Sequence, residues 1–292
     1  MHEWLIGCGQ ITWPRDVSEE VVLADIAAAG YAGAPIGPKP ATSAAERLSM
    51  WQRYGLQPAP GYIGADFWDP KKYSAIIAQT TSYAQFAREV GLTTCYVAAN
   101  VDNTKVVNGR TRMQAAGHAT TADGLTDAEW RQFIETTTEV ATIMQAHGVT
   151  AAFHNHVGSF VETRAELDLL MAAVSPALLA LGPDTGHMAW AGDDPVAMVN
   201  TYATRIVTMH LKDVNAAAAA KARADRTDYR GAERYGVWTE LGQGSVDFPA
   251  IFATLSRARF AGWLIVETDV TQLATPLESA LQSRAYLRTL DK

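Results

Sequence analysis

Cysteine, long apolar runs and basic residues are all scarce in this sequence of 292 residues. Cys8 and Cys95 are its two cysteines, and two isolated thiols indicate a reducing compartment rather than a disulfide framework. No run of 18 or more apolar residues is present, which argues against a membrane-spanning helix. The first ten residues, MHEWLIGCGQ, do not have the basic segment and cleavage site of an export signal. We therefore expect a cytoplasmic protein that does not bind membranes.

Positive charge is also in the minority. The 24 lysine and arginine residues are outnumbered by 31 aspartate and glutamate residues, which gives a formal net charge of −7. Proteins that bind nucleic acids rely on clustered basic groups that displace counterions from the phosphates. The charge balance therefore argues against a nucleic-acid partner and leaves small molecules as the expected ligands.

Short apolar segments alternate with amphipathic segments along the whole chain. Two of the amphipathic segments open with the capping-box pattern of a helix start, at Thr126 and Thr163. Eight apolar segments indicate strands, at residues 4–9, 31–37, 57–64, 93–99, 149–154, 177–184, 205–213 and 263–267. Eight strand–helix units in a chain of this length predict a single α/β domain over residues 1–292, either a (β/α)8 TIM barrel or a doubly wound open sheet.

The last four predicted strands each end in a side chain that can bind a metal ion. These side chains are those of His154, Asp184, His210 and Glu267. Any one of them alone would be an ordinary capping or surface residue, but in a barrel the ends of consecutive strands meet at one rim, so the four should converge. This pattern favours the barrel over the open sheet. Two imidazoles and two carboxylates suit Mn²⁺ or Co²⁺ best, with Zn²⁺, Fe²⁺ or Mg²⁺ as alternatives.

Further polar and aromatic residues near the strand ends are candidates for substrate contacts. His156 lies two positions beyond the end of its strand, in the segment FHNHVG, and should point the same way as the histidine before it. His187 follows Gly186, which is expected to turn the chain sharply so that His187 reaches the pocket. The remaining candidates are Lys212, Arg230 and Trp13.

Two connections are too long to be simple turns, at residues 101–125 and 214–244. Long connections at the rim of a barrel commonly act as lids, substrate clamps or subunit contacts. The second one contains the alanine-rich segment 216–224, which predicts a short helix.

Several motifs of the second half carry a family resemblance, which is clearest over residues 125–290. They resemble the sugar phosphate isomerase/epimerase (xylose-isomerase-like) barrels, and within that group the inosose dehydratases. The motifs are HNHVGSFVET, DTGHMAWAGDDP, MHLKDV and GQGSVDF followed by GWLIVE.

The resemblance also implies roles for particular residues. It implies a metal ion bound by Asp184, His210 and Glu267, with His154 at a position where most of these barrels have glutamate. Pro35 and Asn100 stand where the dehydratases carry carboxylates, so the substrate of this chain can differ from theirs.

The ligand set and the resemblance together imply chemistry on a keto-cyclitol or keto-sugar, such as 2-keto-myo-inositol. Loss of the proton next to the carbonyl produces an enediolate, which a divalent metal stabilises. Glu267 is the expected base and His154 or His187 the expected acid, which favours a lyase that eliminates water. An isomerase or epimerase remains open if His154 serves as a second base.

Two alternative functions also remain open. In the first, the chain is the catalytic subunit of a lyase that cleaves a 3-keto-glycoside and needs a partner subunit; without such a partner, the chain can form a homo-oligomer. A DNA-repair nuclease on the same fold requires a basic groove, and the acidic composition argues against one.

Overall fold

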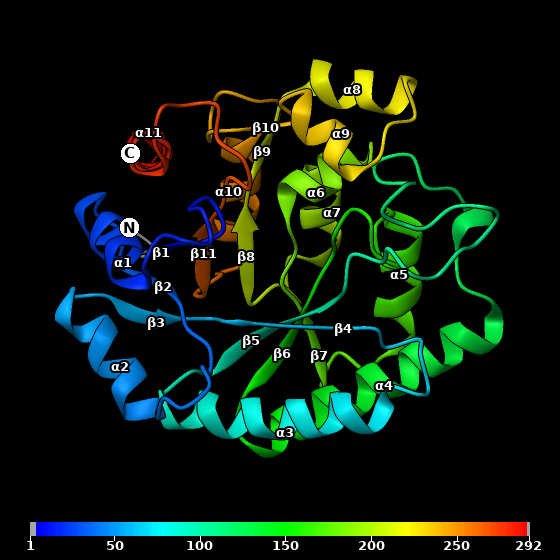
Figure 1. The fold of residues 1–292 in the computed structure, drawn as a ribbon, viewed down its shortest axis with the longest axis horizontal. Coiled ribbons are helices and arrows are strands. Elements are labelled where there is room, and N and C mark those ends of the chain that lie inside the picture. Colours follow the sequence, from blue (N-terminus) through cyan, green and yellow to red (C-terminus); the bar gives the residue numbers. More distant parts are fainter. Residues whose placement is uncertain (1–3, 291–292) are drawn as a thin grey trace.

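Two parallel sheets form the wall of a barrel in the computed structural model, which describes residues 4–290 (Figure 1). One sheet has the strand order β3-β2-β1-β11-β8 and the other has the order β4-β5-β6-β7. The strands of the wall are β1 (Leu5–Cys8), β2 (Gly33–Pro35), β3 (Gln57–Ala59), β4 (Tyr62–Ala65), β5 (Thr94–Ala99), β6 (Thr150–His154), β7 (Leu179–Leu181), β8 (Thr208–Leu211) and β11 (Trp263–Val266).

The two sheets join at both edges. At one edge β3 and β4 follow each other along the chain, because the strand predicted at 57–64 is interrupted at residues 60–61. At the other edge a parallel bridge links Asp184 to His210, and the His210 amide donates to the Pro183 carbonyl at 2.9 Å. The predicted TIM barrel is therefore confirmed.

Helices surround this wall and cover its outer face (Figure 1). The capping boxes predicted at Thr126 and Thr163 both form, at the starts of α4 and α5. None of the helices within residues 4–290 is long and apolar enough to cross a membrane. The helices are α1 (Glu19–Ala28), α2 (Ala44–Arg53), α3 (Tyr73–Glu89), α4 (Asp127–Ala146), α5 (Arg164–Ala173), α6 (Thr185–Trp190), α7 (Pro195–Tyr202), α8 (Ala216–Ala224), α9 (Tyr229–Arg234), α10 (Phe248–Arg257) and α11 (Pro276–Leu290).

Helix α6 stands where the sequence predicts a sharp turn at Gly186, and that prediction is wrong. Asp184 caps the helix, since its side chain accepts a hydrogen bond from the His187 amide at 2.8 Å. Gly186 lies inside the helix, where a Cβ atom would come 2.7 Å from Lys212 Cγ. Glycine is therefore required for close packing against Lys212 and not for a turn.

The two long connections differ in structure. Residues 101–125 contain one short 3₁₀ turn, η1 (Thr121–Asp123), and are otherwise irregular. Residues 214–244 contain α8, which confirms the helix predicted at 216–224, then α9 and β10 (Trp238–Thr239). Strand β10 pairs in antiparallel fashion with β9 (Asp213–Val214), so this connection is a small folded insert on the barrel rim.

Candidate metal centre

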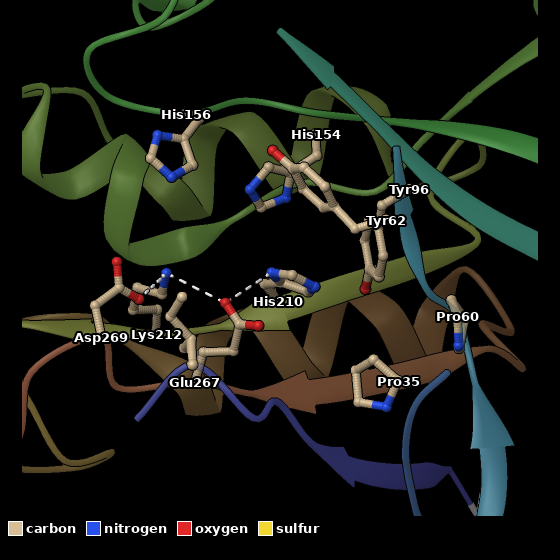
Figure 2. Close-up of a pocket in the computed structure, with 11 residues that line it drawn as sticks. Pro35, Pro60, Tyr62, Tyr96, His154, His156, His210, Lys212, Glu267 and Asp269 are labelled. Atoms are coloured by element: carbon tan, nitrogen blue, oxygen red, sulfur yellow. Dashed lines mark ion pairs between the residues drawn. The ribbon is translucent and has the colours of Figure 1, made fainter. Parts of the chain in front are cut away.

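A pocket of about 360 Å³ lies where the strands end, and we call it the metal pocket (Figure 2). Its polar lining comes from the ends of β6, β8 and β11, and includes His154, His156, His210, Lys212, Glu267 and Asp269. Pro35 and Pro60 lie on the opposite side, while the Tyr62 ring of β4 packs edge-on against His154, with 5.4 Å between the ring centroids (Figure 2). Most of the groups that can bind a metal or move a proton therefore lie on one side.

Strand alternation explains why His154 points into the barrel. The preceding residue, Phe153, packs outward against Phe133 of α4, with 6.2 Å between the ring centroids. Since successive side chains of a strand point to opposite faces, His154 points inward. It faces His210 of β8, with 4.7 Å between the ring centroids.

His154, Asp184 and His210 form a cluster whose potential ligand atoms all lie within 4.8 Å of one another. Among the residues that the structure describes, no hydrogen bond of good geometry reaches the buried atoms His154 Nδ1, Asp184 Oδ2 and His210 Nδ1, although the last two lie within 3.4 Å of Lys212 Nζ and 3.1 Å of Glu267 Oε2, respectively. Buried polar atoms without partners are rare, because they lose their hydration without compensation. A divalent cation would satisfy all three atoms, so the residues fit a metal ion.

Glu267 adjoins this cluster. Its Oε2 atom lies 3.1 Å from His210 Nδ1 and 3.3 Å from Lys212 Nζ. Burial alone would raise the pKa of Glu267, but His210 and Lys212 outweigh it and lower the pKa to about 2. The carboxylate is therefore ionised, and the structure brings the four predicted metal ligands together.

Glu267 is also packed tightly against Gly9, at the end of β1. A Cβ atom at position 9 would come 2.5 Å from Glu267 Cγ and still closer to Oε1. Any larger residue would push the Glu267 side chain away. Gly9 binds no ligand itself, but the absence of a side chain there leaves the space that Glu267 occupies.

Lys212 is the centre of an ion-pair network. Its ammonium lies 2.6 Å from Asp269 Oδ1, 3.3 Å from Glu267 Oε2 and 3.4 Å from Asp184 Oδ2. Burial lowers the pKa of Lys212, but these carboxylates more than compensate and raise it above its usual range. Lys212, predicted from the sequence to bind substrate, lines the pocket as a fixed positive charge.

The charges around Lys212 do not balance. Three carboxylates face a single ammonium, and burial lowers the pKa of His154 well below its usual range and that of His156 to about 4. Burial also raises the pKa of Asp184, which reflects the unfavourable environment of that charge. Carboxylates therefore outnumber the ammonium, and a bound cation would offset the excess of negative charge.

The Asn155 side chain forms two hydrogen bonds with the backbone of Asp184. This side chain points away from the pocket, where Oδ1 accepts from the Asp184 amide at 2.9 Å. Its Nδ2 donates to the Asp184 carbonyl at 3.3 Å. This paired contact fixes the backbone of a candidate ligand, in the manner of the supporting residues found behind metal ligands.

His156 lines the metal pocket through a defined ring orientation. Its Nδ1 atom lies 2.7 Å from the Val157 carbonyl, which can only accept, so Nδ1 carries the proton. The other nitrogen, Nε2, therefore has a free lone pair. The ring is nearly parallel to that of Tyr229, at a centroid distance of 6.0 Å.

His187 lies behind the pocket lining rather than within it. It is fully buried, and its Nε2 atom is 3.3 Å from Lys212 Nζ. Its Nδ1 accepts from the Val157 amide at 3.4 Å. These contacts place His187 as a support for Lys212.

Trp13 and Arg230 lie outside the metal pocket, in a neighbouring cleft. The Trp13 indole donates to Asp25 of α1 at 2.9 Å, and its ring is largely buried. Arg230 is mostly exposed and donates to Glu233 at 2.8 Å.

Asp269 is a site residue that the sequence reasoning missed. It lines the metal pocket, contacts Lys212 and accepts a hydrogen bond from the Tyr229 hydroxyl at 3.2 Å. Asp269 lies two positions beyond Glu267, just as His156 lies two beyond His154. The alternation that predicted His156 would therefore also have found Asp269.

Comparison with protein families identifies relatives over nearly the whole chain. Residues 23–290 match the family described as xylose isomerase-like TIM barrel. The chain is 30% identical to an inosose dehydratase of Geobacillus kaustophilus strain HTA426, over 99% of this chain and 96% of that protein. It is 31% identical to the rhizopine catabolism protein MocC of Rhizobium meliloti, over 90% of this chain and 81% of that protein.

Solved structures share the same fold. The IOLI protein with a bound zinc atom superposes with a TM-score of 0.72 at 15% identity, over 98% of this chain and 97% of that one. An L-ribulose 3-epimerase superposes with a TM-score of 0.71 at 18% identity, over 98% of this chain and 93% of that one. With a family match over most of its length and relatives of this kind, the chain is an enzyme that belongs to the xylose isomerase-like TIM barrel family.

Proposed function

We propose that the protein is a divalent-metal-dependent lyase that removes water from a keto-cyclitol or keto-sugar such as 2-keto-myo-inositol. The observation that carries this proposal is the buried cluster of His154, Asp184 and His210, with Glu267 beside it, at the floor of a pocket of about 360 Å³. The 30% identity to an inosose dehydratase supports the choice of substrate.

His154, Asp184, His210 and Glu267 would hold the cation, with Mn²⁺ or Co²⁺ as the expected ion. When bound, the cation supplies a Lewis acid for the carbonyl oxygen of the substrate. Lys212 adds a fixed positive charge at the same wall, and the closed surroundings strengthen its attraction for developing negative charge.

His156 is the residue that we assign to proton transfer, in place of His187 and of the ligands His154 and Glu267. It lines the pocket with Nε2 free, whereas His187 is turned toward Lys212. His156 Nε2 accepts the proton from the carbon next to the carbonyl. The carbon–oxygen bond at the next carbon then breaks, and the imidazolium returns the proton to the departing hydroxyl. Water leaves, and a carbon–carbon double bond forms.

The distribution of carboxylates favours elimination over epimerisation. An epimerase that exchanges a proton between two faces of its substrate needs a proton-transfer group on each face. Glu267 and Asp269 both follow β11 and both contact Lys212, so they lie on one side of the pocket. Pro35 and Pro60, on the side away from Asp269, supply no second carboxylate, and burial raises the pKa of the Tyr62 hydroxyl, which makes it a poor base (Figure 2).

Turnover of 2-keto-myo-inositol in D₂O tests the proposal. Protein reconstituted with Mn²⁺ or Co²⁺ is expected to form an ultraviolet-absorbing product that has lost one water, as seen by mass spectrometry. The His156→Asn variant should keep its metal content and lose about 10²- to 10⁴-fold in turnover, the usual contribution of a general acid–base residue. Protein treated with a chelator is the matched control.

Two other outcomes contradict the proposal. Deuterium uptake into a product of unchanged formula identifies an isomerase or epimerase instead. Absence of turnover with 2-keto-myo-inositol and with a panel of keto-sugars rejects a keto-polyol substrate. A cytoplasmic location, a homo-oligomer and a partner subunit all stay predictions, which fractionation and gel filtration test.

A further inference from the structure

A second cavity, which we call the rim cleft, opens beside the metal pocket. Its walls include Trp13, Met113, His156, Tyr229, Arg230 and Glu233. The volume of the rim cleft is about 710 Å³, against about 360 Å³ for the metal pocket. Ile11, His156 and Asp269 line both cavities, so the two adjoin at these side chains.

The junction lies at one end of the metal pocket. Figure 2 shows His156 and Asp269 on the side away from Pro35 and Pro60. The free Nε2 atom of His156 and the carboxylate of Asp269 are therefore the polar groups at the boundary between the cavities. A ligand that extends from the metal pocket in this direction would reach the rim cleft.

Both long connections contribute to the rim cleft. Val101 and Met113 come from residues 101–125, and Arg230 comes from helix α9 within residues 214–244. The two connections are tied together by a hydrogen bond from the Tyr229 amide to the Met113 carbonyl at 3.1 Å. The chain thus uses two long connections to build a cavity that adjoins the metal pocket.

The chemistry of the rim cleft suits an uncharged polar group. Arg230 is paired with Glu233, and Asp269 is paired with Lys212, so Arg15 is the one charged side chain of this lining without an ion pair within residues 4–290, and it is exposed to solvent. The Arg230–Glu233 ion pair, with 2.8 Å between donor and acceptor, offers donors and acceptors to hydroxyl groups. Trp13, Val101 and Met113 provide apolar contact for the carbon face of a ring.

We propose that the rim cleft binds a second, uncharged and hydroxylated ring, joined to the ring that occupies the metal pocket. The substrate class is then a glycosylated keto-polyol, with the link between its rings beside His156 and Asp269. This inference rests on the proposed function, because it assumes that the reacting ring is a keto-polyol in the metal pocket.

Calorimetric binding to the manganese-loaded protein tests this inference without turnover. The two ligands are myo-inositol and an O-glucosyl-myo-inositol, which have no carbonyl group. The glucosylated ligand is expected to bind at least tenfold more tightly. Arg230→Ala should remove most of this advantage and leave the affinity for myo-inositol unchanged, whereas Arg234→Ala, an exposed change on the same helix, should affect neither.

Equal affinities of the intact protein for the two ligands would overturn the inference. So would an Arg230→Ala variant that keeps the full advantage of the glucosylated ligand. In both cases, myo-inositol binding that requires manganese would still support the proposed function. If neither ligand binds the loaded protein, the proposed function fails together with the inference.

Discussion

The two halves of the barrel rim differ sharply in chemistry although the same fold builds both. The ends of β6, β8 and β11, with Asp184 beyond β7, carry the imidazoles, the carboxylates and Lys212. The ends of β2 and β5 carry Pro35 and Asn100, and the Asn100 amide is exposed and donates to Asp66 at 3.0 Å. The barrel thus supplies positions, while the residues at the strand ends supply the chemistry.

The supporting residues follow the same division. Asn155 forms hydrogen bonds with the Asp184 backbone. Gly9 leaves space for the side chain of Glu267, and Gly186 leaves space for that of Lys212. By contrast, a Cβ atom at Gly37, after β2, would meet its nearest atom at 3.9 Å. The contacts of Asn155, Gly9 and Gly186 therefore hold charged residues in place despite their mutual repulsion, whereas Gly37 supports no charged side chain.

The largest effect is expected from Asp184→Asn, which removes a charge from the metal cluster. We expect metal content to fall to background and kcat/KM to drop by more than about 100-fold, since even supporting residues of metal sites contribute about 10- to 100-fold. The metal-free variant should be at least as stable as the metal-free parent, because a buried carboxylate in an excess of negative charge is removed. Metal analysis and thermal unfolding with a chelator measure both effects, and a variant with full metal content contradicts the assignment.

Gly9→Ala should have the next largest effect, although position 9 binds nothing. The added methyl group displaces Glu267, so we expect metal affinity and kcat/KM to fall about 10- to 100-fold. Gly37→Ala is the matched control in the other half of the rim and should leave both values unchanged. Equal losses in the two variants would show that the loss at position 9 does not come from displacing Glu267.

A smaller effect on stability is expected from Asp123→Asn, in the 101–125 connection. Arg110 donates two hydrogen bonds of 2.7 Å to Asp123, so the substitution should reduce the free energy of unfolding by about 2 kcal/mol at pH 7. Arg110 holds the pKa of Asp123 below its usual range. The stabilisation is therefore present above about pH 4 and is lost as the pH falls further. Denaturation at pH 7, 5 and 3 measures this, and a difference between variant and parent that is as large at pH 3 as at pH 7 contradicts it.

The smallest effect is expected from Asn100→Ala. Its side chain is exposed and contacts Asp66 rather than the metal pocket, so metal content and kcat/KM should stay within about twofold. Steady-state kinetics with the reconstituted protein measures this. A larger loss of kcat/KM would show that the end of β5 takes part in the reaction. It would then contradict the chemical difference between the two halves of the rim.

Much of the fold was predictable because helices and strands leave local patterns. Apolar segments and capping boxes located the barrel strands and the starts of α4 and α5. Helix α6 was not predictable, because it has only six residues and contains Gly186. It is stabilised by the Asp184 cap and by packing on Lys212, which lies 26 positions from Gly186 in sequence and is not visible in a local pattern.

The candidate site was predictable to a similar degree. The four candidate ligands were recognisable because each closes a predicted strand, and the strand period would also have indicated Asp269. The support from Asn155 and Gly9 was not recognisable, since it depends on contacts between different strands.

The sequence by itself determined which side chains stand at the strand ends and which way most of them point, since backbone geometry sets the alternation within each strand. Only the tertiary structure decided that His187 faces Lys212 and that two distant connections meet in one cleft. Those contacts join residues far apart in the chain. They exist only once the barrel has closed and brought its strand ends together.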